Sequence, residues 1–218
     1  MQYIFDINTP TPLCEIMGRH GSDKGHANIT QCWHNYTTFY HSIFKDMQHK
    51  PLRIFEFGLG TNNLSVPSNM GPNGKPGASL YGWSEFFPNS KIYGADIDMN
   101  ILFETDRIKT YYCDQTNPVI IKMMWNQTEL AEGGFDIIVE DGLHTYNANV
   151  CFFENSIHKL NDGGYYIIED ILNYELRLFE TKIAMWRNRY PQLEFTMLCI
   201  PSSRNTNDNN LLVIRKTK

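Results

Sequence analysis

The alternation of short apolar runs with segments of helical spacing is the feature that most constrains the fold. Runs rich in β-branched and aromatic residues predict strands at 52–57, 91–96, 108–112, 135–140, 164–169, 193–199 and 211–215. Spacings of three and four residues predict helices at about 35–48, 78–87, 117–127, 146–160 and 173–190. Strands that alternate with helices in this way indicate an α/β fold with a mostly parallel sheet.

The end of the chain departs from this alternation. The last two predicted strands are joined only by the polar segment PSSRNTNDNN at 201–210, and a short polar connection of this kind predicts an antiparallel hairpin. Parallel strands followed by a C-terminal antiparallel hairpin, with helices on both faces, are the layout of the Rossmann-like seven-stranded methyltransferase sheet. A dehydrogenase sheet would stay parallel throughout.

The first three predicted strands end in residues suited to a nucleotide-like cofactor. FEFGLGTNN places glycines directly after a strand, where the backbone can turn tightly and approach a ligand. An acid that ends the second strand can accept hydrogen bonds from ribose hydroxyls, and one that ends the third can meet an adenine amino group. The cofactor-binding candidates are Glu56, Gly58, Gly60, Asn62, Asp96, Asp114 and Glu140.

One of these acids, and a further acid near the end of the second strand, have a simpler interpretation. Asp114 could instead cap the helix predicted to begin near Pro118, and Asp98 is better explained as a turn or cap residue than as a ligand.

The two most apolar strands deliver carboxylates to what a parallel sheet would make one edge. FDIIVEDGLH ends in Asp141 with His144 three residues later, and GGYYIIEDI ends in Glu169 and Asp170. Such acids can bind a hard cation such as Mg²⁺, and the histidine can move a proton. They could also only cap the helices that follow. Glu140 is not expected to be a metal ligand, because alternation along the strand turns it away from Asp141.

Two further segments are expected on the substrate side of this edge. The segment TNNLSVPSNMGPNGKPG at 61–77 is long and rich in Gly, Pro and Asn, as lids over cofactors often are. The segment 21–40 carries polar residues that predict a cover, although surface or core duty is open for each: Asp23, Lys24, His26, His34, Tyr36 and Tyr40. We therefore expect an N-terminal helical cover over 1–50 and a cofactor-binding core over 51–218, packed as one compact unit.

Net charge, hydropathy and cysteine content limit the classes of partner and the cellular compartment that we expect. The net charge is −5 and no Lys/Arg stripe is present, so we expect no nucleic-acid binding. No apolar run reaches the ~18 residues of a membrane span, so we expect no membrane partner. Five widely spaced cysteines without a CxxC pair, and a start unlike a signal peptide, favour reduced thiols in the cytoplasm.

Together these motifs resemble class I S-adenosylmethionine-dependent methyltransferases. More narrowly, GSDKG (21–25), YTTFYHSIF (36–44), GASLYGWSEFFPNSKIYGADI (77–97), EDGLH (140–144) and IIEDI (167–171) resemble the macrocin and mycinamicin sugar O-methyltransferase group, whose relatives occur in bacterial surface-polysaccharide modification. The resemblance implies S-adenosylmethionine as cofactor, Mg²⁺ held by Asp141, Glu169 and Asp170, and His144 with Asp141 as the catalytic pair. Leu143 departs from the serine that the group often has.

The sequence thus predicts an O-methyltransferase that acts on a small-molecule acceptor, a sugar or a phosphorylated precursor, as in capsule or surface-polysaccharide biosynthesis. Two other functions stay open: a nicotinamide-dependent oxidoreductase on a Rossmann sheet, and a non-catalytic cofactor-binding module. A homodimer is compatible with the sequence, which carries no direct sign of oligomeric state.

Overall fold

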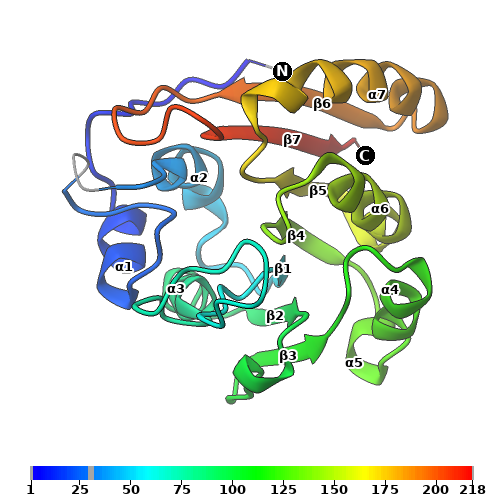
Figure 1. The fold of residues 1–218 in the computed structure, drawn as a ribbon, viewed down its shortest axis with the longest axis horizontal. Coiled ribbons are helices and arrows are strands. Elements are labelled where there is room, and N and C mark those ends of the chain that lie inside the picture. Colours follow the sequence, from blue (N-terminus) through cyan, green and yellow to red (C-terminus); the bar gives the residue numbers. More distant parts are fainter. Residues whose placement is uncertain (1, 29–31, 218) are drawn as a thin grey trace.

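A seven-stranded sheet forms the centre of the molecule in the computed structural model, which describes residues 2–28 and 32–217 (Figure 1). The strands are β1 (Arg53–Phe57), β2 (Lys91–Asp96), β3 (Ile108–Tyr112), β4 (Phe135–Glu140), β5 (Leu160–Ile168), β6 (Leu193–Cys199) and β7 (Asn210–Lys216). Their order across the sheet is β3-β2-β1-β4-β5-β7-β6. The pairs among β1 to β5 are parallel and β7 runs antiparallel to both of its neighbours, so the predicted fold class is confirmed.

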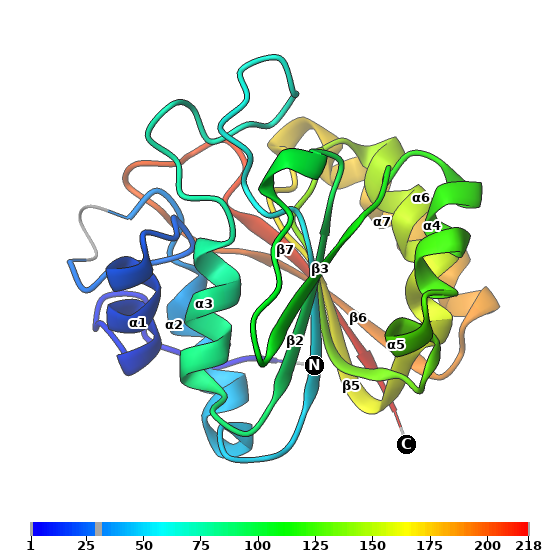
Figure 2. The ribbon, with the colours of Figure 1, turned by 90° about the horizontal axis from the view of Figure 1, so that it is seen from below.

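Helices cover both faces of this sheet. The α-helices are α1 (Pro12–His20), α2 (Tyr36–Phe44), α3 (Ala78–Phe86), α4 (Pro118–Trp125), α5 (Thr128–Ala131), α6 (Tyr146–Ser156) and α7 (Leu176–Arg189). Short 3₁₀ turns are η2 (Lys45–Met47), η3 (Met99–Ile101), η4 (Ile157–Lys159) and η5 (Asn173–Glu175). Figure 2 shows α1, α2 and α3 on one side of the sheet and α4 to α7 on the other.

Alternation along the strands builds a separate core on each face. Ile54 of β1 and Ile137 of β4 belong to the core under α1, α2 and α3. Their neighbours Phe55 and Ile138 belong to the core under α4, α6 and α7. Because consecutive side chains of a strand point to opposite faces, a fully apolar strand supplies both cores at once.

The main errors of the predicted elements are at their ends. The helix predicted over 146–160 ends at Ser156, and Leu160 already belongs to β5. The register between β4 and β5 shifts near Phe135, so the early part of β5 is irregular and its sequence, LNDGG, does not look like a strand. The strands predicted at 91–96, 108–112, 135–140 and 193–199 have the predicted bounds.

The helix α1 was missed by the prediction, although its ends carry recognisable signals. Thr11 caps it by accepting a hydrogen bond from the Cys14 amide, Pro12 occupies its first turn, and Gly21 ends it with φ 87°. Residues of α1 and α2 share one core with the sheet. The division into 1–50 and 51–218 stays a prediction. In the described part of the chain, none of the helices is both long and apolar enough to span a bilayer.

Candidate active site

One cavity of about 690 Å³ lies where the strands β1, β2, β4 and β5 end, at the edge where ligands of open α/β sheets bind. Its volume is in the range of small-molecule sites. The predicted site residues that line it are Gly58, Gly60, Asp96, Asp114, Asp141, His144 and Asp170. The structure therefore brings the predicted cofactor half and the predicted cation half into a single space.

Gly58 allows two strand ends to approach each other at the floor of this cavity. Its φ is 91°, and a Cβ atom there would lie 1.8 Å from the carbonyl oxygen of Asp141. Glycine is therefore needed at position 58 for two reasons. It allows the tight turn, and it allows the loop after β1 and the loop after β4 to touch through their backbones.

We expect Gly58→Ala to lower the free energy of unfolding by about 3 kcal/mol or more, because it combines a strained φ with a backbone clash. Gly71 is the matched control, since its φ is 70° but nothing lies within 4 Å of an added Cβ. Gly71→Ala should cost only about 1 kcal/mol. Urea unfolding of both variants separates the cost of the positive φ from the cost of the backbone clash. Equal losses of unfolding free energy would contradict the close approach of the two loops.

The two acids of the second and third strands have different surroundings. Asp96 is buried and accepts hydrogen bonds from the Leu59 amide at 2.7 Å and the Asp98 amide at 2.8 Å. It thereby ties the glycine-rich loop to the end of β2 while still lining the cavity. Asp114 accepts from Thr116 and does not cap α4, whose cap is Asn117. Asp98 caps η3, as its alternative interpretation predicted.

Four other candidates do not line the cavity: Glu56, Asn62, Glu140 and Glu169. Glu56 is fully buried and accepts hydrogen bonds from Ser79 and from Trp83 Nε1. Glu140 accepts from Gln115, and its other oxygen has no hydrogen-bond partner among the described residues. Asn62 is exposed beside Gly74.

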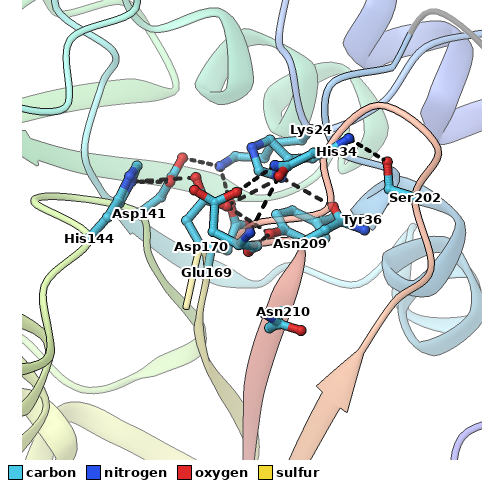
Figure 3. Close-up of polar contacts among 12 residues, drawn as sticks. Lys24, His34, Tyr36, Asp141, His144, Glu169, Asp170, Ser202, Asn209 and Asn210 are labelled. Carbon is cyan, nitrogen blue, oxygen red and sulfur yellow. Dashed lines mark hydrogen bonds and ion pairs between the residues drawn. The ribbon is translucent and has the colours of Figure 1, made fainter. Parts of the chain in front are cut away.

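Asp141, His144 and Asp170 form the cluster nearest to a metal site. One ligand atom from each lies within 4.8 Å of those of the other two. His144 Nε2 is 3.0 Å from Asp141 Oδ1 and 3.6 Å from Asp170 Oδ2 (Figure 3). Oxygens bound to one Mg²⁺ at about 2.1 Å can lie about 4.2 Å apart, so these carboxylates fit a shared cation with little movement.

The backbone and the charge of this cluster are both unusual. His144 and Asp170 each have a φ of 55°, a region that non-glycine residues seldom adopt. Burial alone would lower the pKa of His144, but the charge of Asp170 and the hydrogen bond to Asp141 raise it to about 10. The imidazole is therefore protonated at neutral pH, with the two acids beside it as its partners.

Glu169 is buried behind the cavity lining and is joined to Asp141 through Lys24. Tyr40 donates to its Oε1, and the Lys24 ammonium donates to its Oε2 at 2.5 Å. Lys24 also donates to Asp141 Oδ2. Sequence reasoning placed Lys24 and Tyr40 only on a general cover, since nothing in a local pattern reports contacts made more than a hundred residues away.

The segment before α2 and the loop before β7 form a polar wall next to Asp170. Tyr36 donates to Asp170 Oδ1 at 2.7 Å, and His34 Nδ1 lies 3.4 Å from the same oxygen. His34 Nδ1 also lies 3.2 Å from Asn209 Oδ1 (Figure 3). With Asp208 and half-exposed Trp33, His34 lines the cavity.

The loop predicted as a lid also reaches this cavity. Residues 66–70 line it, and Ser68 Oγ donates to the Leu143 carbonyl at 2.9 Å. The loop thus contacts the residue directly before His144.

Sequence comparison finds relatives of one chemical type. The 8-demethyl-8-(2-methoxy-alpha-L-rhamnosyl)-tetracenomycin-C 3'-O-methyltransferase of Streptomyces olivaceus is 29% identical over 162 residues, 74% of this chain and 37% of that protein. Demethylmacrocin O-methyltransferase of Streptomyces fradiae is 32% identical over 148 residues, 66% of this chain and 34% of that protein. This chain therefore spans about a third of the length of these relatives. No family model matches the chain.

Structural comparison shows that the fold is that of a methyltransferase. The MycE methyltransferase of the mycinamycin biosynthetic pathway, solved in complex with Mg and SAH, aligns with a TM-score of 0.72 at 21% identity. The alignment covers 97% of this chain and 56% of that one. The predicted resemblance to class I methyltransferases and to the macrocin and mycinamicin group is confirmed.

Proposed function

We propose that this chain, which has the class I methyltransferase fold and sugar O-methyltransferases among its relatives, is itself an S-adenosylmethionine-dependent, Mg²⁺-assisted O-methyltransferase. The observation that supports this best is the single cavity that joins the Gly58–Asp96–Asp114 side to the Asp141–His144–Asp170 side. Methyl transfer needs donor and acceptor oxygen in line within one space, and a shared cavity is the first requirement for this.

The charge of the cavity favours a cationic donor. Six aspartates and two lysines line it among the described residues. A sulfonium is attracted to such a lining, whereas the pyrophosphate of a nicotinamide dinucleotide would be repelled. This speaks for S-adenosylmethionine over the oxidoreductase alternative. We assign Gly58 and Gly60 to the close approach of the donor, Asp96 to its ribose and Asp114 to its adenine.

We assign the acceptor chemistry to the other half of the cavity. Asp141 and Asp170 would hold Mg²⁺, with Glu169 as the predicted third carboxylate. The bound cation would lower the cost of removing a hydroxyl proton. His144 would accept that proton, because its charge-raised pKa falls once the carboxylates beside it are neutralised. His34, Asp208 and Trp33 would position the acceptor.

The acceptor that we propose is a sugar or another small hydroxyl compound. Because the cavity lining is acidic, a phosphorylated acceptor should bind less favourably than an uncharged one. Sugar units of a surface polysaccharide or capsule are the setting that we propose from the motifs. The two relatives described above are named for a rhamnosyl-tetracenomycin and for demethylmacrocin. We also propose a cytoplasmic location, because the five cysteines are free thiols, which a reducing compartment favours. A homodimer is the proposed oligomeric state.

Titration calorimetry with S-adenosylmethionine tests the donor half. We expect binding with a micromolar Kd, and at least about tenfold weaker binding by Asp96→Ala, which removes the carboxylate that orders the Leu59 amide. An Asp98→Ala variant is the control, because Asp98 is also buried near the end of β2 but lies outside the cavity lining. Absence of binding at high micromolar donor would end the proposal.

A further inference from the structure

A lysine ammonium lies inside the carboxylate cluster that we assign to the cation. Lys24 is only 2% exposed, and it comes from the segment between α1 and α2. Its Nζ contacts Asp141 Oδ2 and Glu169 Oε2 (Figure 3). It also lies 3.7 Å from Glu56 Oε1. Two of its three partners are predicted metal ligands.

The oxygens that Lys24 occupies are those that a three-carboxylate metal site would need. Asp141 keeps only Oδ1 on the side of His144, and Glu169 has its second oxygen bonded to Tyr40. A divalent cation that binds Glu169 as well as Asp141 must therefore take oxygens from the ammonium. Two cations held within a few ångströms of each other also repel strongly where water is excluded.

We propose that Lys24 is a positioning residue that serves as the resident counter-cation of this cluster, and that a divalent cation binds by exchange with it. The inference rests on the proposed metal site. Without metal, Lys24 is a counter-charge for the buried Glu56 and Glu169 and shares Asp141 with His144. Carboxylates buried without such a partner are strongly unfavourable. With metal, the ammonium gives up Asp141 and Glu169. Lys24 thus stabilises the metal-free fold and, for the same reason, weakens the affinity for metal.

The test is Lys24→Met, which keeps the length and apolar stem of the side chain and removes its charge. Mg²⁺ and Mn²⁺ affinities are measured by calorimetry without donor or acceptor. We expect binding at least about tenfold tighter than in the wild type. Metal-free thermal unfolding should occur roughly 10 °C lower, and added Mg²⁺ should raise the Tm of the variant more than that of the wild type.

Three controls make the result specific. Lys24→Arg keeps the charge and should bind no more tightly than the wild type. Lys75→Met removes an exposed lysine of the same cavity wall and should change the affinity by less than about twofold. If Lys24→Met does not fold without metal, Lys24→Met/Glu169→Gln removes one charge of each sign. That double variant should then bind Mg²⁺ more tightly than Glu169→Gln alone, because Asp141 is freed.

Equal or weaker binding by folded Lys24→Met, or by the double variant against its parent, would overturn the exchange. So would the absence of Mg²⁺ and Mn²⁺ binding in all variants. S-adenosylmethionine titration of the same samples keeps the two proposals apart. Normal donor binding with unchanged metal affinity removes the role of Lys24 alone, whereas loss of donor binding in the wild type removes the proposed function.

Discussion

Asp141→Asn is expected to reduce methyl transfer about a thousandfold or more while leaving the affinity for S-adenosylmethionine within about twofold. The amide keeps the size of the side chain but loses the charge that both Lys24 and His144 contact. It also removes an oxygen ligand from the proposed cation. Donor contacts are assigned to residues at the ends of the strands β1, β2 and β3, so they should survive.

Single-turnover assays with labelled donor measure this loss, and calorimetry measures donor binding in the same preparation. Asp114→Asn is the matched control, because it makes the same change at the other end of the same cavity. It should weaken donor binding and leave the metal dependence of the rate unchanged. Full activity of the wild type in excess chelator would contradict the metal assignment, even if Asp141→Asn were inactive.

His144→Gln is expected to lower kcat about 10²- to 10⁴-fold, with little change in the KM for the donor. Glutamine retains a hydrogen-bonding group beside Asp141 but cannot accept a proton at working pH. His34→Gln is the comparison, since His34 also lies beside Asp170. It should raise the KM for the acceptor and leave kcat largely intact.

The pH profile gives this prediction a second measurement. A base must be unprotonated to act, so kcat of the wild type should rise with pH through the pKa of His144. Burial lowers that pKa, but Asp170 and Asp141 raise it to about 10 when no cation screens them. The rise should therefore move to higher pH as Mg²⁺ becomes limiting, and it should be absent in His144→Gln. A rise that stays in place at every Mg²⁺ concentration would exclude His144 as the metal-linked base.

The acid-tipped strands were predictable from sequence because their information is local. An apolar run that ends in carboxylates fixes both the strand and the sheet edge at which the acids lie, as Asp141 and Asp170 show. Four strands were predicted with their observed bounds for the same reason. Helix ends were less accurate, because η4 continues the helical pattern past Ser156 without belonging to α6.

The direction of individual side chains was harder to predict. Alternation along β4 correctly separated Glu140 from Asp141, and the same argument separates Glu169 from Asp170. In the structure Glu169 lies toward Lys24 and Tyr40, and Asp170 lies toward His144. The partners of Glu169 come from the far N-terminal part of the chain, so only the folded structure could reveal that this acid has a cation beside it.

The acidic lining of the cavity has a consequence for the end of the proposed reaction. Once the methyl group has left, the sulfonium becomes an uncharged thioether, and the attraction to the surrounding aspartates is lost. The same carboxylates that draw in the fresh donor therefore hold its spent form less tightly. Turnover would then be protected against product inhibition by the charge of the cavity wall, without any separate device for ejecting the by-product.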